Sequence, residues 1–374
     1  MIDDKKIDWI RLFCTPSIGS VTFRHLIAKF GDATQAINNL PLLANKLGRG
    51  SYQNKQITIP TKEWAAAYAA KCEKNGVFLV ASYEKEFPKR FLATNDYPAI
   101  LHVKCKKSLF EADFLNQDSL AVIGARNASL QGISFTSKIT ADLCANNLVI
   151  VSGLARGVDS AAHKAALSSG TIAVVGCGVD VVYPPENKEL YDQIIANGAV
   201  VSEMLLGREP RGQSFSYRNR IISGMSLGVL VIEAAMKSGS LVTARYAAEQ
   251  GRDVFAIPGH PYDVRAQGAN YLIRNGAILT ENASQILEGI AASRNKYVGN
   301  VYAQINLEEE QAEYEEYTAN IRTMLLDGLS YAPISIGEIM QNIGDVRVQF
   351  LQAALAELEL MGAIEIDGNI VRRI

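Results

Sequence analysis

The residues that could do chemistry gather in five short turns, each rich in glycine, serine or proline and each placed directly after an apolar run. In open α/β sheets, ligands bind beyond the carboxyl ends of the strands and next to helix N-termini. These turns therefore predict a crevice lined by backbone N–H groups and hydroxyls. They are Gly124–Ser129, Ser152–Asp159, Gly176–Gly178, Lys237–Ser240 and Pro258–Pro261.

Arginines accompany the turns and indicate the charge of a ligand. Arg126 and Arg156 stand inside the first two turns, and Arg218 and Arg220 lie in a later segment. Guanidinium groups together with free N–H groups favour an anion such as a phosphate. The alternative is that the glycines only permit tight strand–helix turns, as in any fold of this kind.

The catalytic inventory of this crevice is thin. The sequence lacks the patterns G-x-G-x-x-G, G-x-x-x-x-G-K-[ST] and G-x-S-x-G, which mark dinucleotide sites, P-loops and nucleophile elbows. His163 lies one turn into a helix beside no evident acid–base partner. Asp159 and Asp180 are typical of cap and turn acids rather than of a metal pair. We therefore expect no catalysis, no cofactor and no metal site.

The segment Gln213–Ile222, QSFSYRNRII, indicates a different kind of chemistry because aromatic residues alternate in it with arginines. Phe215 or Tyr217 could stack a nucleobase while Arg218 or Arg220 holds the backbone of a single strand. From residue 202 to residue 274, nine basic residues stand against six acidic ones. A solvated helix with core aromatics explains the same composition, so both interpretations stay open.

The elements that must position these turns are short apolar strands alternating with amphipathic helices from Gly76 onward. Such an alternation is typical of a parallel sheet covered by helices on both faces. We expect a doubly wound α/β domain at residues 76–292. Its strands are predicted at Val77–Ala81, Ile100–Val103, Leu120–Ile123, Val149–Ser152, Ile172–Val175, Val200–Ser202, Val229–Glu233 and Val254–Ile257, with helices at Ser134–Ala145, Ser160–Ser168, Leu241–Gln250 and Asn270–Asn275.

Two smaller domains are expected beside this one. Residues 1–75 carry apolar positions at helical spacing, and their turn Ser17–Ser20 either presents N–H groups to a phosphate or simply joins two helices. An acidic linker or linker helix is expected at 293–317, where the periodicity is lost. Residues 318–374 have the order of a winged helix. Its helices are predicted at Ile321–Leu326, Ile336–Ile343 and Val348–Met361, and its hairpin at Ala363–Ile366 and Ile370–Arg373.

Composition sets the outer limits of these interpretations. The 374 residues are 48% hydrophobic, which fits a globular chain of two or three domains. The 37 Lys+Arg against 39 Asp+Glu argue against a chain that is basic throughout, but a local basic patch remains open. Five scattered cysteines without C-x-x-C, and an N-terminus without an apolar signal region, predict a cytoplasmic protein without membrane contact.

Several motifs, read together, resemble one family. They are Gly124–Arg126, Ser152–Asp159 with Ala162-His163, Thr171–Gly178 with Tyr183-Pro184, Arg218–Gly224, Ser238–Ala244 and Val254–Gly259. In this order they are similar to the DNA-processing protein A family (DprA, also called Smf) over residues 76–290. The flanking domains also fit the architecture of that family.

The resemblance implies an extended Rossmann-like domain between a helical domain of SAM or helix-hairpin-helix type and a winged-helix-like domain. It implies a protein that binds and protects single-stranded DNA and helps to load the recombinase RecA during natural transformation or recombination, without catalysis. It also implies a homodimer formed through the Rossmann-like domain. The DNA-binding positions that it implies are Gly124, Arg126, Ser152, Gly153, Arg156, Lys164, Phe215, Arg218, Arg220, Ser238, Gly239, Ser240 and Thr243.

Two departures from the family concern one loop. Leu205 and Ser216 stand where the family often has proline, so the loop Gly207–Ser216 is expected to be freer. The alternative function is that of a nucleotide-processing enzyme, because phosphoribohydrolases that activate cytokinins have a related Rossmann-like fold. Their stretch P-G-G-x-G-T-x-x-E carries a catalytic glutamate, whereas the comparable junction here, Lys237–Ala244, has none.

The last domain carries charge of the wrong sign for a DNA-reading winged helix. Residues 318–374 contain four basic and seven acidic residues, and the candidate recognition helix Val348–Glu359 has no lysine or arginine. A helix that reads duplex DNA needs cations against the phosphates. We expect this domain not to bind duplex DNA strongly and to serve instead as a protein-contact or packing module.

Overall fold

The computed structural model describes residues 3–47, 58–94, 96–291, 307–343, 348–367 and 370–374. The chain divides into two compact units, one made of Met1–Ala69 with Ala303–Ile374 and the other of Ala70–Tyr302. The domain boundaries expected at residues 75/76 and 317/318 stay predictions. The boundary at 292/293 and the first part of the expected acidic linker lie outside the described residues.

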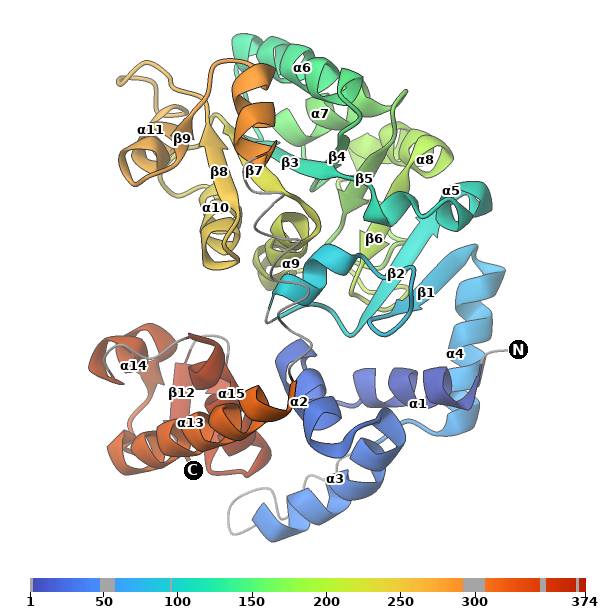
Figure 1. Cartoon of the computed structure of the whole chain (residues 1–374), viewed down its shortest axis with the longest axis vertical. Coiled ribbons are helices and arrows are strands. Elements are labelled where there is room, and N and C mark those ends of the chain that lie inside the picture. Colours follow the sequence, from blue (N-terminus) through green and yellow to red (C-terminus); the bar gives the residue numbers. More distant parts are fainter. Residues whose placement is uncertain (1–2, 48–57, 95, 292–306, 344–347, 368–369) are drawn as a thin grey trace. The chain divides into compact units, whose positions relative to one another are not determined.

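The second unit is built on one sheet whose strands alternate with helices (Figure 1). The strands are β1 (Val77–Ala81), β2 (Ile100–Cys105), β3 (Ser119–Gly124), β4 (Val149–Ser152), β5 (Thr171–Val174), β6 (Ala199–Ser202), β7 (Gly228–Ile232), β8 (Asp253–Ala256) and β9 (Ile278–Leu279). The helices include α5 (Lys107–Glu111), α6 (Leu130–Ala145), α7 (Val158–Ala166), α8 (Lys188–Asn197), α9 (Gly212–Met225), α10 (Gly239–Glu249) and α11 (Gln267–Arg274). A further helix covers residues 283–291. The predicted α/β fold is confirmed.

The strand order is β1-β2-β6-β5-β4-β3-β7-β8-β9. All pairs from β6 to β9 are parallel, whereas β1 runs antiparallel to β2 and β2 antiparallel to β6. The sheet therefore differs from a wholly parallel one at one edge. A parallel connection needs a crossover, usually a helix, and the described residues between β1 and β2 (82–94 and 96–99) contain only a short 3-10 helix (Lys89–Ala93).

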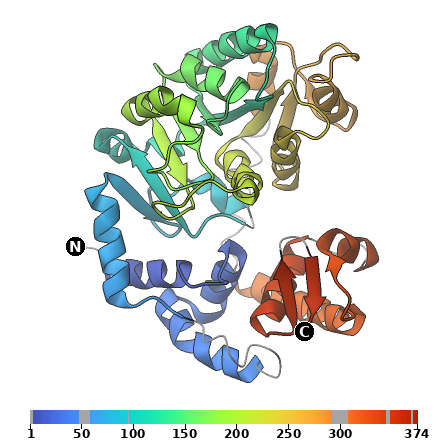
Figure 2. The same ribbon diagram turned by 180° about the vertical axis from the view of Figure 1, so that it is seen from behind.

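The central strands feed two cores, one on each face of the sheet. Along β3, Ala121 and Ile123 join the core under α9 and α10, whereas Leu120 and Val122 join the core under α6 and α7. Alternate side chains of a strand point to opposite faces, so a strand buried on both faces is apolar at every position. Figure 2, the view from behind, shows the helices on both sides of the sheet. This double burial explains the continuous apolar runs in the sequence.

Segment 207–216, expected to be a free loop, is a loop only in part. Helix α9 begins at Gly212 and takes in Phe215 and Tyr217, and its residues from Arg218 onward are buried. The aromatic–arginine segment is thus a helix, with its first turn at the surface and its remainder against the sheet. The Ser, Asn, Phe and Tyr residues of this segment have weak helix propensity, and burial of Ile221 and Ile222 overrides it.

The first unit contains the N-terminal helices α1 (Asp4–Phe13), α2 (Ser20–Phe30) and α3 (Ala33–Leu47), and α4 (Lys62–Lys74) follows them. It also contains the C-terminal elements α13 (Leu307–Gly328), β10 (Ile334–Ser335), α14 (Ile336–Ile343), α15 (Val348–Leu360), β11 (Ile364–Asp367) and β12 (Ile370–Arg373). The last three strands form a sheet in the order β10-β12-β11. The winged-helix assignment stays a prediction, and the tip of its hairpin, residues 368–369, lies outside the described residues.

Candidate nucleic-acid interface

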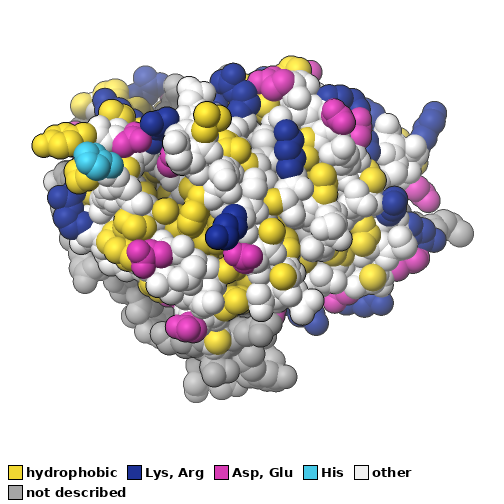
Figure 3. All heavy atoms as spheres, turned by 90° about the horizontal axis from the view of Figure 1, so that it is seen from above, with side chains coloured by type: hydrophobic (Ala, Val, Ile, Leu, Met, Phe, Trp, Pro, Cys, Tyr) yellow, Lys and Arg dark blue, Asp and Glu magenta, His cyan; other side chains and the backbone are white. Residues whose placement is uncertain are grey.

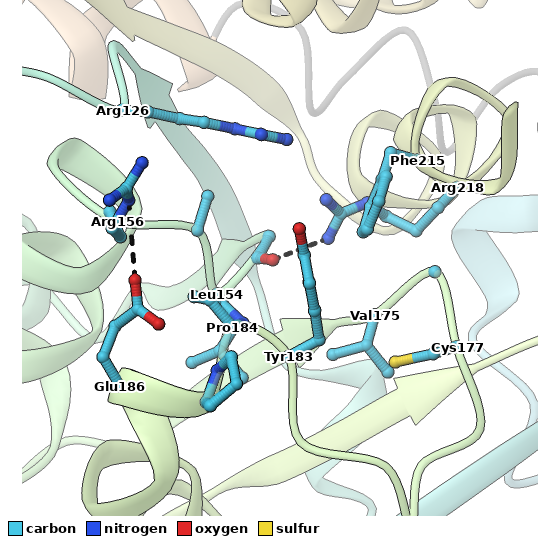
Figure 4. Close-up of a pocket in the computed structure, with 14 residues that line it drawn as sticks. Arg126, Leu154, Arg156, Val175, Cys177, Tyr183, Pro184, Glu186, Phe215 and Arg218 are labelled. Atoms are coloured by element: carbon cyan, nitrogen blue, oxygen red, sulfur yellow. Dashed lines mark hydrogen bonds and ion pairs between the residues drawn. The ribbon is translucent and has the colours of Figure 1, made fainter. Parts of the chain in front are cut away.

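The parallel strands bring all five predicted turns to one edge of the sheet, because the carboxyl ends of β3, β4, β5, β7 and β8 face the same way. The turns after β3, β4 and β5, together with the start of α9, surround a pocket of about 240 Å³ (Figure 4). The turns after β7 and β8 lie outside its lining. The sequence therefore predicts correctly that the five turns lie at one edge of the sheet. The structure shows that three of the five turns line the pocket.

Two exposed arginines flank this pocket. Arg126 leaves the turn after β3, and its guanidinium carbon lies 5.8 Å from the ring centre of Phe215. Among the residues that the structure describes, Arg126 forms no ion pair. Arg156 leaves the turn after β4, and its Nε lies 3.6 Å from a carboxylate oxygen of Glu186. Both side chains of that pair are more than half exposed, so solvent weakens their attraction.

A third arginine forms the inner wall of the pocket. Arg218 of α9 is only 6% exposed and donates through Nη1 to the carbonyl oxygens of Gly153 (2.9 Å) and Val174. Its Nε–H is buried and has no hydrogen-bond partner in the described structure. Burial lowers the pKa of Arg218 to about 10, against the opposing effect of Asp159, so the guanidinium remains charged at neutral pH. The inner wall of the pocket thus carries a positive charge.

The turn after β4 is shaped by contacts that only glycine permits. A Cβ at Gly153 would lie 2.7 Å from the guanidinium of Arg218 and 2.8 Å from the carboxylate of Asp159. Gly157 has φ +76°, and a Cβ there would lie 2.2 Å from the carbonyl oxygen of Ala125. Asp159 accepts from the N–H groups of Gly153 (3.1 Å) and Ala155 (3.3 Å) and so holds the turn. The glycines bring two loops together as well as turning the chain.

Two aromatic rings form the outer wall of the pocket. Phe215 of α9 and Tyr183 pack with their ring centres 5.2 Å apart and their planes tilted by 31°. Figure 4 shows Tyr183 standing between Phe215 and the turn after β4. Both rings line the pocket, and both are partly exposed. Flat aromatic surfaces beside cations can hold a nucleobase and its phosphates together.

Arg220 does not line this pocket. Its side chain is 1% exposed, with Nη2 2.6 Å from the Glu203 carboxylate and Nε 3.8 Å from that of Asp96. Its guanidinium carbon lies 4.0 Å from the ring centre of Tyr217. Burial by itself lowers the pKa of Arg220, but Glu203, Tyr217 and Asp96 together outweigh burial and raise it, so the guanidinium stays charged. This placement favours a stabilising role within the fold over a contact with DNA.

The remaining predicted residues are spread along the same edge. Ser152 is buried and donates to the carbonyl of Val122 (2.6 Å), and Ser240 donates to that of Gly124 (2.9 Å). Thr243 is buried on α10. Ser238, which caps α10, lies in a separate groove between α10 and α11, Gly239 begins that helix, and Lys164 is exposed on α7. Their roles in binding stay predictions.

Glu233 occupies the place where a dinucleotide fold would hold a phosphate. Strand β3 lies between β4 and β7 in the sheet, and the chain adds strands first on the β4 side and then on the β7 side. Ligands of dinucleotide-binding folds bind at the point where the strand order reverses in this way. Here the Glu233 carboxylate accepts from the backbone N–H of Ser129 (2.8 Å) and from its hydroxyl, at the N-terminus of α6. The helix end is satisfied from within the chain, which fits the absence of the G-x-G-x-x-G pattern.

Tyr183, Glu186 and Asp159 are not among the predicted site residues. Tyr183 lies five residues beyond the third turn, and this proximity in the sequence is the signal that points to it. His163, which is not expected to be a catalyst, is buried, and its Nδ1 lies 2.8 Å from Thr171 Oγ1.

Among the described residues, no group of three or more His, Cys, Asp or Glu side chains is arranged to hold a metal ion. Within the same described residues, every helix is too short or too polar to cross a membrane.

Two family models match the chain. One, described as DNA recombination-mediator protein A, matches residues 78–291, and one described as a DprA-like N-terminal HHH domain matches residues 3–66. Among curated relatives, Protein Smf of Escherichia coli is 43% identical over 57% of this chain and 56% of its own length. The DNA processing protein DprA of Streptococcus pneumoniae is 49% identical over 47% of this chain and 62% of its own length. These matches leave more than a third of each relative uncovered.

Solved structures agree with these matches. The crystal structure of DprA from Streptococcus pneumoniae superposes with a TM-score of 0.56 at 34% identity, over 72% of this chain and 98% of that one. A structure of DNA processing protein A from Helicobacter pylori, whose subject is its single-stranded DNA binding mode, gives a TM-score of 0.52 at 29% identity. It covers 58% of this chain and 96% of that one.

Proposed function

The chain belongs to the DNA recombination-mediator protein A family, and on that premise we propose that it binds single-stranded DNA in the pocket at the carboxyl ends of β3, β4 and β5. One observation carries the proposal. Arg126, Arg156 and the buried Arg218 surround two aromatic rings in a space of about 240 Å³. The Helicobacter pylori relative is described by its single-stranded DNA binding mode, which supports the same class of ligand here.

Each part of the pocket has a separate task in this proposal. Arg126 and Arg156 attract backbone phosphates, and a phosphate that reaches Arg156 competes with Glu186 for it. Phe215 and Tyr183 stack a base. This contact does not depend on the DNA sequence, because every base has a flat aromatic face. The charged guanidinium of Arg218, which forms the inner wall, adds a buried positive charge that attracts the bound nucleotide. Ser152, Arg220 and Ser240 then act by holding the pocket rather than by touching DNA.

The wider role follows from the family rather than from the pocket. We propose that the protein protects single strands in the cytoplasm during natural transformation or recombination, loads a RecA-type recombinase onto them, and acts as a homodimer through residues 76–292. In this role it binds without catalysis. The junction Lys237–Ala244 lacks the glutamate that the phosphoribohydrolase alternative requires, and Glu233 is already bonded to Ser129.

The test is binding of a fluorescein-labelled dT oligomer over a salt series. We expect log K to fall with log salt by about 0.7 for each phosphate contact with a single strand. Arg126→Ala should weaken binding about tenfold or more, the effect of losing one charge-assisted hydrogen bond, and should lower the slope by one contact without lowering the melting temperature. Lys138→Ala is the matched control, because Lys138 is exposed on α6, lies outside the lining of the pocket and is not a predicted DNA-binding position. Unchanged affinity of Arg126→Ala would remove the pocket from the proposal.

A further inference from the structure

The loop between β8 and α11 holds side chains that the pocket does not use. Tyr262 is 90% exposed and Val264 is 61% exposed, and Leu130 at the start of α6 is 86% exposed. Large apolar side chains so open to water mark binding surfaces when they lie together. We infer that Tyr262 is a second base-stacking platform, on which the strand leaving the proposed DNA pocket rests a further nucleobase. This inference depends on the proposed function.

The loop is held firmly although its tip is exposed. The side chain of Asn270 binds both the N–H (3.1 Å) and the carbonyl (2.8 Å) of Gly259. Asp263 forms an ion pair with Arg265 at 2.9 Å, and the backbone of Arg265 accepts from the N–H of Ala234. A ring presented on an anchored loop loses little conformational entropy when a base stacks on it. The exposed tip is therefore a preformed surface on an anchored loop.

A series of contacts in the structure connects this loop to the proposed DNA pocket. Ala234 follows Glu233, whose carboxylate binds Ser129, and Ser129 lies three residues beyond Arg126. Leu130 comes next, at the start of α6. The strand order places β8 three positions from β4, the middle strand of the pocket, about 14 Å along the sheet edge at the usual strand spacing. At 3.4 Å per stacked nucleotide, about four nucleotides cover that distance.

The chemistry of the loop indicates bases rather than phosphates. The single cation of its tip, Arg265, is paired with Asp263, and the neighbouring aromatic group is His260, whose ring centre lies 5.6 Å from that of Tyr262. In Figure 3, a histidine lies against hydrophobic side chains at one end of the face, and lysines and arginines lie both near it and farther along the face. In this proposal Arg126 and Arg156 at the pocket contact the phosphate backbone of the DNA. Tyr262, at the nearly neutral tip of the loop, contacts a base.

The experiment compares Tyr262→Ala, Tyr262→Phe and Arg126→Ala in the full chain, with two labelled strands of the same length, dT12 and an abasic 12-mer. Tyr262→Ala should weaken dT12 binding between about 5-fold and 150-fold, the effect of losing one base–aromatic stack, and should leave the salt slope unchanged. It should not alter binding of the abasic strand. Tyr262→Phe should keep most of the affinity. Tyr331→Ala is the matched control, because this tyrosine is 74% exposed in the other unit.

Two failures are distinguishable. If Arg126→Ala weakens dT12 and Tyr262→Ala does not, or if Tyr262→Ala weakens both strands equally, the second platform is overturned and the pocket stands. If the wild type does not bind dT12, or Arg126→Ala binds as the wild type does, the proposed function itself fails. Light scattering adds one outcome, since a change of mass in Tyr262→Ala means that the loop meets a second copy of the chain, which also overturns the platform.

Discussion

Arg220 gives a prediction that separates stability from binding. The change Arg220→Ala removes a buried cation and leaves the Glu203 carboxylate, 2.6 Å from it, buried without its counter-charge. Breaking a buried ion pair on one side costs about 3–5 kcal/mol. The unit that contains it spans residues 70–302, and a domain of this size loses about 2–4 °C of melting temperature per kcal/mol. We expect the melting temperature of this unit to fall by about 6–20 °C.

The assay is thermal unfolding followed by circular dichroism, with dT binding measured at 10 °C. Arg245→Ala is the matched control, because Arg245 forms an exposed pair with Glu249 at 3.5 Å and such pairs contribute about 0–1 kcal/mol. The double change Arg220→Met with Glu203→Leu should lose less stability than Arg220→Ala, since no buried charge is left alone. A variant Arg220→Ala that melts as the wild type does but no longer binds dT would refute the assignment of Arg220 to the fold.

Three further predictions rest on other contacts. Burial lowers the pKa of His163 to about 3 and that of His102 to about 4, so below pH 6.5 the unfolded chain takes up protons that the folded chain refuses. Stability should therefore decrease as the pH falls from 6.5 to 4, by about 2 kcal/mol per histidine at pH 5. Burial raises the pKa of Asp159 and Glu203, which acts in the opposite direction, so urea titrations at pH 7 and pH 5 compare the wild type with His163→Gln; the same change of stability in both chains would contradict the burial of His163. Glu233→Ala should cost about 1–2 kcal/mol, seen as about 2–8 °C of melting temperature, through loss of the cap on α6, with dT affinity kept. Truncation after residue 317 should leave binding of a 20-bp duplex unchanged, because Glu357 of α15 already pairs with His25 (2.7 Å) and Arg322 (3.0 Å); a loss with a steep salt dependence would show that the domain reads DNA.

The sequence predicts the sheet well because each central strand is buried on both faces. That burial requires apolar residues at every position of runs such as Val229–Ile232, and no polar alternation obscures them. The sequence predicts β1 with the bounds Val77–Ala81 that the structure has, but not its antiparallel direction, and it does not predict the two-residue β9. The first carries no sign of direction, and the second, Ile278–Leu279, is too short to show a period.

The site was predictable in its place and less so in its members. Glycine turns after parallel strands identify the edge, since topology alone brings their ends together. Arg218 and Arg220 stand two residues apart in one motif, yet one lines the pocket and the other pairs with Glu203. Their spacing on a helix turns their side chains to different neighbours, and that separation depends on which face of α9 meets the sheet. Sequence spacing does not carry this information.

The central claim is that a nucleobase stacks in the pocket beside Arg126. The most direct measurement is photo-crosslinking of the full chain to a dT oligomer containing 5-iodouracil, with the attached peptides identified by mass spectrometry. We predict crosslinks to Phe215 and Tyr183, which weaken when Arg126 is replaced by alanine. Crosslinks confined to the groove between α10 and α11, or to residues of the first unit, would contradict the account.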